Sequence, residues 1–148
     1  MLVLSTLLYG AETWSLKKTD ENRLQTFEMS CLRRILGVTR LDRIRNTEIR
    51  RTLNVKLTVI EKIAQKRLRY FGHVQRMPPT RFPKIALEGR INGSRPRGRP
   101  PKRWIDCIKF DCSQRGVSTL GQAVSLARER LKWREILKWM PTLNPPLE

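Results

Sequence analysis

Apolar residues recur at three- and four-residue spacing along most of the chain, which is the pattern of amphipathic helices. The longest such segment begins after Thr58, where Thr58 and Glu61 have the spacing of a capping box, and ends at Met77-Pro78-Pro79. The positions on its inward stripe are Ile60, Ile63, Ala64, Arg67, Leu68, Phe71 and Val74. The pattern predicts a long helix that packs on a core along one side and carries Lys62, Lys66, Arg69 and Arg76 on its flanks.

Three further helices are predicted before this one. The apolar opening up to Leu8 is predicted to be the tail of a core helix. Thr19 is the predicted N-cap of a helix that runs to Gly37, and Asn46 that of a short helix ending near Asn54. The residues predicted to face inward on the Thr19 helix are Leu24, Phe27, Cys31, Leu32 and Ile35.

The C-terminal part has the same character. A helix is predicted from Trp104 to about Cys112, ending at Gly116, and a second from Ser118 or Thr119 that continues or resumes toward Trp139. Its predicted inward residues are Leu120, Ala123, Val124, Ala127, Leu131, Trp133, Ile136 and Leu137. The segment 81–92 fits a short strand or an extended segment, and no element is assigned to it.

The predicted fold is therefore all-α. It is a small basic helical bundle, or two helical subdomains joined by an extended linker rich in Arg, Pro and Gly. The predicted divisions are a helical segment 1–77, the linker 78–103, a small helical segment 104–140 and a tail 141–148.

Charge points to the class of partner. The 148 residues include 31 Lys and Arg against 13 Asp and Glu, a formal net charge of +18, so a polyanion is the expected partner. No apolar run is long enough to span a membrane and no secretion signal is evident, so we expect no membrane partner. Three cysteines without paired spacing favour an intracellular location, nuclear or cytoplasmic.

The stretch 95–103, called here the basic ribbon, is the strongest candidate site. It contains five cations and no acid, its prolines keep the backbone extended, and Gly98 permits close approach to a ligand. The predicted nucleic-acid-binding residues are Arg95, Arg97, Gly98, Arg99, Pro100, Lys102 and Arg103, extended by Lys62, Lys66 and Arg69. Trp104 and Tyr70 would stack on bases if exposed, with core packing as the competing role. A solvated basic loop is the alternative interpretation of the ribbon.

The sequence contains no recognisable active site. Its acids are scattered, and Asp106 and Asp111 lie about 140° apart on a helix, a poor arrangement for a shared metal. His73 is the single histidine and is distant in sequence from the cysteines, which disfavours a zinc site. We therefore predict no catalytic residues, no metal, no cofactor and no small-molecule substrate.

Several strings in a fixed order resemble the C-terminal region of reverse transcriptases from LINE-type, non-LTR retrotransposons. They are Leu7-Leu8-Tyr9-Gly10-Ala11-Glu12-Thr13-Trp14, Arg33-Arg34-Ile35-Leu36-Gly37, Asp42-Arg43-Ile44-Arg45-Asn46, Arg67-Leu68-Arg69-Tyr70-Phe71-Gly72-His73-Val74-Gln75-Arg76-Met77, Gly98-Arg99-Pro100 and Arg103-Trp104-Ile105-Asp106. Tyr70 departs from the family, which often has Trp there. The resemblance implies that 1–77 is thumb-like, that the catalytic aspartates of the palm and the endonuclease are absent, and that an upstream polymerase domain is the natural packing partner.

Three hypotheses follow. The first is a non-catalytic module that grips the phosphates of RNA, DNA or a hybrid. The second is a chromatin or regulatory protein that reads A·T minor grooves, because Arg97-Gly98-Arg99-Pro100 matches the AT-hook pattern. The third is a truncated retrotransposon copy without a function.

Overall fold

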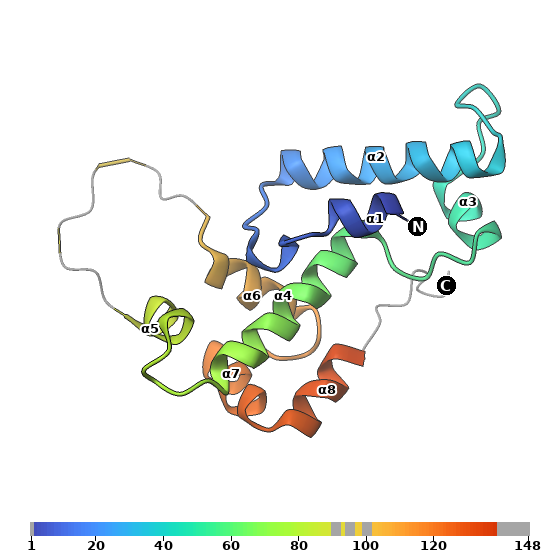
Figure 1. Cartoon of the computed structure of the whole chain (residues 1–148). Helices are drawn as coiled ribbons and strands as arrows, with labels where there is room; N and C mark the ends of the chain where they lie inside the picture. The colour runs from blue at the N-terminus through green and yellow to red at the C-terminus, as the bar shows by residue number, and fades with distance from the viewer. Residues whose placement is uncertain (1, 90–92, 94–96, 99–101, 139–148) are drawn as a thin grey trace.

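A computed structural model describes residues 2–89, 93, 97–98 and 102–138 of the chain. Within these residues the chain forms α-helices and one short 3-10 helix, with no strand (Figure 1). The elements are α1 (Leu2–Leu7), η1 (Ala11–Thr13), α2 (Lys18–Leu36), α3 (Asn46–Thr52), α4 (Val59–Gln75), α5 (Phe82–Glu88), α6 (Trp104–Ser113), α7 (Leu120–Arg128) and α8 (Arg130–Lys138). The predicted all-α class is confirmed, and 81–92 contributes a helix where none was assigned. The predicted divisions stay a prediction, and the tail 141–148 lies outside the described residues.

Helix α4 is the element on which the others pack. Its start is the predicted capping box: the Thr58 hydroxyl accepts a hydrogen bond from the Glu61 amide at 3.3 Å, and the Glu61 carboxylate accepts one from the Thr58 amide at 2.6 Å. The predicted inward stripe is confirmed, since Ile63, Leu68 and Phe71 are fully buried. Burial of this apolar face holds the bundle together.

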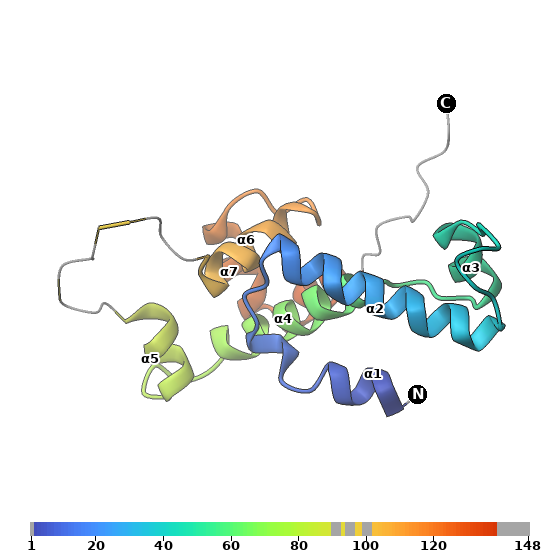
Figure 2. The ribbon, with the colours of Figure 1, turned by 90° about the horizontal axis from the view of Figure 1, so that it is seen from above.

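Two hydrophobic clusters lie along α4. The N-terminal cluster consists of Leu8, Ala11, Val59 and Ile63. The C-terminal cluster consists of Leu68, Phe71, Ile108, Cys112, Val117, Ala123, Ala127 and Trp133. Helices α6, α7 and α8 surround the C-terminal half of α4, whereas α1 and α2 lie beside its N-terminal half (Figures 1 and 2).

Helix α2 departs from its prediction at its start and on its buried face. Its N-cap is Lys17, whose amide donates to the Asp20 carboxylate at 3.3 Å, so the predicted N-cap Thr19 lies inside the helix. Phe27 and Ile35 are 44% and 68% exposed, contrary to the predicted inward stripe. The buried residues are instead Glu28 and Met29. The cause is α3, which packs on a neighbouring face and pairs Arg50 with Glu28 at 2.9 Å.

Two smaller predictions also change. Asn46 is the first residue of α3 and not its N-cap, because its side-chain oxygen accepts from Arg33 at 2.6 Å. Leu131, predicted to face inward, is 74% exposed. The helical conformation is interrupted at Glu129, whose backbone is extended. Helix α8 therefore starts in a different rotational orientation, which buries Trp133.

Candidate nucleic-acid interface

The structure describes four of the predicted residues in the basic ribbon: Arg97, Gly98, Lys102 and Arg103. The other predicted members, Arg95, Arg99 and Pro100, lie outside the described residues. Lys102 donates to the carbonyl of Leu16 at 2.8 Å, and Arg103 donates from two nitrogens to Asp106 at 3.2 and 3.1 Å. The hydrogen bonds from Arg103 lower the pKa of Asp106, because they stabilise its carboxylate. Both cations therefore fix the start of α6 while remaining exposed.

The three predicted cations of α4 are in different environments. Lys66 is half-buried and donates to the carbonyl of Leu8 at 2.7 Å, so it ties α4 to the segment after α1. Lys62 is half-buried, whereas Arg69 is exposed. Arg69 lines a cavity on the side of α4 that faces α8. Of the three, Arg69 is the one that lines this cavity.

This α4–α8 cavity has a volume of about 460 Å³. It is lined by Gln65, Arg69, Arg76, Arg130, Trp133, Arg134, Leu137 and Lys138. Five of these residues are cationic and none is acidic. Trp133 and Leu137 add an apolar surface, so the cavity combines positive charge with a hydrophobic wall.

The local structure explains why these cations meet. Arg130, Arg134 and Lys138 are spaced by four residues and therefore share one side of α8, while Gln65, Arg69 and Arg76 share one side of α4. Two hydrogen bonds hold the two helices in this register. They join the Trp133 indole to the Leu68 carbonyl at 3.0 Å and the Gln65 amide to the Leu137 carbonyl at 3.0 Å. Arg76, the residue after α4, donates to the Ala127 carbonyl of α7 at 2.6 Å.

The charges in this cavity are largely uncompensated. Within the described part of the chain, the side chains of Arg69, Arg130, Arg134 and Lys138 form no hydrogen bond or ion pair. Desolvation lowers the pKa of Arg76, and repulsion from Arg130 lowers it further. An anion placed among these cations would relieve that repulsion.

The residues predicted from the sequence do not include the α8 half of this cavity. Arg130, Arg134 and Lys138 were not singled out, although their regular four-residue spacing on a helix with a buried Trp was a usable signal. Their proximity to Arg69 depends on the packing of α8 against α4, across more than 60 residues of sequence, which spacing alone does not give.

The two aromatic candidates form part of the folded structure. The Trp104 indole donates to the Glu12 carbonyl at 2.8 Å, and its ring meets Tyr70 edge-on with centroids 6.0 Å apart. Trp104 also packs against the C-terminal cluster, so core packing is the role that its contacts show. Base stacking by Trp104 or Tyr70 stays a prediction.

Among residues 2–89, 93, 97–98 and 102–138, no group of three or more His, Cys, Asp and Glu side chains is placed to hold a metal ion. In the same ranges, no helix has the length and apolar character needed to cross a bilayer.

Comparison with known proteins gives a relative of transposon origin. The chain is 26% identical over 145 residues to an uncharacterized transposon-derived protein of Caenorhabditis elegans. The match covers 93% of the chain and 51% of the relative, so the chain spans about half the length of this protein. No protein-family model and no solved structure matches the chain. The similarity supports a transposon-related origin.

Proposed function

We propose that this chain is a nucleic-acid-binding part of a transposon-derived protein and that it grips phosphates through the α4–α8 cavity and the basic ribbon. The observation that carries the proposal is the meeting of five cations, with no acid, around the cavity between α4 and α8. Holding like charges together costs free energy in the unliganded protein. A phosphodiester backbone supplies a closely spaced row of anions that would offset this cost.

The chemistry of the lining fits phosphate. Arginine presents a planar fork of N–H donors that matches phosphate oxygens, and four of the five cations are arginines. The formal net charge of +18 would draw a polyanion toward the protein from any direction. Binding of this kind releases counterions and is strongly salt-dependent.

A more specific form of this proposal is that the chain forms the end of the thumb and the C-terminal extension of a LINE-type reverse transcriptase. It is supported by the ordered strings described above and by the transposon-derived relative. In this assignment the chain contacts template RNA or an RNA–DNA hybrid and performs no catalysis. Polymerase and endonuclease chemistry would belong to segments that this sequence does not contain.

A charge-matched pair of variants tests the proposal. Arg130→Gln with Arg134→Gln removes two cations of the cavity, and Arg23→Gln with Arg34→Gln removes two exposed cations of α2 that lie outside it. Affinity for a single-stranded RNA is measured across a salt series by fluorescence anisotropy. Each phosphate contact contributes about 0.7 to the slope of log K against log salt, so the cavity variant should lose about 1.4.

The α2 variant should keep a slope close to that of the unmodified chain. Equal losses in both variants would mean that net charge and not the cavity governs binding. Absence of binding at physiological salt would overturn the proposal and favour the hypothesis of a remnant without function.

The ribbon is tested separately with Arg97→Ala and Arg99→Ala in one chain. A backbone grip predicts similar losses on RNA, A/T-rich duplex and G/C-rich duplex. Loss confined to the A/T-rich duplex would instead favour the minor-groove hypothesis.

A further inference from the structure

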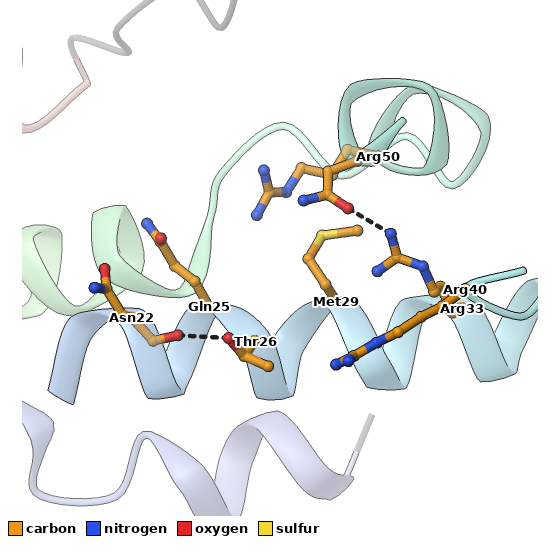
Figure 3. Close-up of a pocket in the computed structure, with 8 residues that line it drawn as sticks. Asn22, Gln25, Thr26, Met29, Arg33, Arg40 and Arg50 are labelled. Carbon is orange, nitrogen blue, oxygen red and sulfur yellow. Dashed lines mark hydrogen bonds between the residues drawn. The ribbon is translucent and has the colours of Figure 1, made fainter. Parts of the chain in front are cut away.

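A second pocket lies between α2 and α3, away from the residues of the α4–α8 cavity (Figure 3). Its volume is about 450 Å³, within the range of about 300–1,000 Å³ that is typical of small-molecule sites. It is lined by Asn22, Gln25, Thr26, Met29, Arg33, Arg40, Asn46 and Arg50. None of the candidate residues from the sequence lies in this α2–α3 pocket.

One end of the pocket offers hydrogen-bonding groups that the fold does not use. Among the described residues, the side-chain amides of Asn22 and Gln25 have no hydrogen-bond partner. Each amide has both a donor and an acceptor, which is the combination that pairs with the edge of a nucleobase. Figure 3 shows both residues on the same part of α2, next to Thr26.

Met29 is the apolar residue in the lining of the pocket. It is 5% exposed and lies on α2 between Gln25 and Arg33 (Figure 3). Its flexible, polarizable thioether packs well against the flat face of an aromatic ring. A purine or pyrimidine has such a face together with a polar edge, whereas a phosphate group alone has neither.

Three arginines line the rest of the pocket, and hydrogen bonds hold two of them in place. Arg33 donates to the Asn46 side chain at 2.6 Å, and Arg50 is held by the buried carboxylate of Glu28 at 2.9 Å. The Arg50 Nε atom is buried without a hydrogen-bond partner, and Arg40 has no partner among the described residues. Guanidinium groups stack on bases and bind the adjoining phosphate.

We propose that the α2–α3 pocket binds one unpaired nucleobase of a single-stranded nucleic acid, with its phosphate on the arginine side. This inference rests on the proposed nucleic-acid binding and adds the class of ligand to it. A duplex keeps its bases stacked and paired, whereas a single strand can turn a base out onto amides and guanidinium planes. The partner is therefore a single-stranded segment, read at one base.

The experiment compares a single-stranded DNA oligonucleotide with an abasic strand of the same length, which keeps the phosphates and lacks the bases. The probe variants are Gln25→Ala and the double change Asn22→Ala with Gln25→Ala, which leave the net charge unchanged and suit a helix. Gln114→Ala, at an exposed position that lines neither cavity, is the matched control. Circular dichroism melts verify that each variant is folded.

The unmodified chain should bind the normal strand about tenfold more tightly than the abasic strand, because amide contacts to a base edge discriminate by roughly this factor. The double variant should lose most of this ratio while its affinity for the abasic strand stays unchanged. An unchanged ratio, or equal losses on both strands, would overturn the base pocket. With either result, binding of the unmodified chain to the abasic strand would still support the phosphate-gripping function. If the unmodified chain bound neither strand, the base pocket and the phosphate-gripping function would both be overturned.

Discussion

Arg67 on α4 forms a forked ion pair with Asp111 on α6. Its Nε and Nη2 atoms donate to the two carboxylate oxygens at 2.9 and 3.0 Å, and both side chains are 5% exposed. Arg67 also donates to the carbonyl of Trp14 at 3.3 Å, and Arg115 donates to the Asp111 carbonyl at 2.9 Å. Burial raises the pKa of Asp111, and the hydrogen bonds from Arg67 oppose that rise. The pair therefore fastens α6 to α4 at the edge of the C-terminal cluster.

Breaking this pair on one side should strongly destabilise the fold. Arg67→Met leaves the carboxylate of Asp111 buried without its partner and should cost about 3–5 kcal/mol in the free energy of unfolding. Adding Asp111→Leu removes the unpaired charge and should recover most of the loss. The measurement is urea denaturation followed by circular dichroism.

The exposed pair of Arg51 and Glu48, 3.1 Å apart on α3, provides the control. Arg51→Met should cost less than about 1 kcal/mol, because water screens that pair. If Arg67→Met were as mild as Arg51→Met, the buried pair would not have the structural role assigned to it.

Gly72 allows α8 to approach α4 closely. A Cβ atom added at Gly72 would overlap the Nε1 and Cδ1 atoms of the Trp133 indole, which lies against the helix and donates to the Leu68 carbonyl. Alanine has the higher helix propensity by about 1 kcal/mol, but the overlap should cost about 1–3 kcal/mol. We therefore expect Gly72→Ala to lower the Tm, measured by thermal melts.

Gly121→Ala is the matched change, because a Cβ atom there meets no atom within 4 Å. It lies near the start of α7 and should leave the Tm unchanged or raise it slightly. A rise in Tm for Gly72→Ala as well would show that the indole moves aside at little cost.

Cys112 should be unreactive in the folded protein. Burial in the C-terminal cluster raises the pKa of its thiol to about 11, with a smaller contribution from Asp111. At pH 8 only about one thiol in a thousand would be ionised, and the thiolate is the reactive form. Iodoacetamide at pH 8 should therefore leave Cys112 unmodified in the native protein and label it in urea, as read by mass spectrometry of its peptide.

The same shift has a defined effect on stability. Because the folded-state pKa lies above that of an unfolded thiol, ionisation favours the unfolded chain. The contribution of the neutral Cys112 thiol to the free energy of unfolding is complete below about pH 9 and is lost as the pH rises toward 11. Labelling of native Cys112 at the rate of the half-buried Cys31 would contradict this account.

Local sequence signals predicted the positions of the helices well, but predicted less well which face of each helix is buried. The start of α4 and its buried stripe followed from Thr58, Glu61 and the apolar spacing, since a capping box and a helical stripe involve only near neighbours in sequence. The buried face of α2 did not, because α3 selects the side with Glu28 and Met29 over the more apolar side with Phe27. Which face of a helix is covered depends on its tertiary partner.

The two basic pockets show the same limit. Sequence singled out Arg69 but not Arg134, which lines the same cavity from another helix. In the α2–α3 pocket, Gln25 and Arg40 come from a helix and from the loop that follows it, and no local pattern marks them as neighbours. Positive charge is visible in a sequence, whereas the place where it converges is a property of the fold.

Because α4 contributes residues to both hydrophobic clusters, the opening of the two ends of the molecule is coupled. Val59 and Ile63 belong to one cluster, and Leu68 and Phe71 to the other, within a single uninterrupted helix. Its central amides become free to exchange with solvent only when both clusters have opened. Among the described helices, α4 is therefore expected to exchange most slowly, and the α4–α8 cavity would be lost whenever α4 opens.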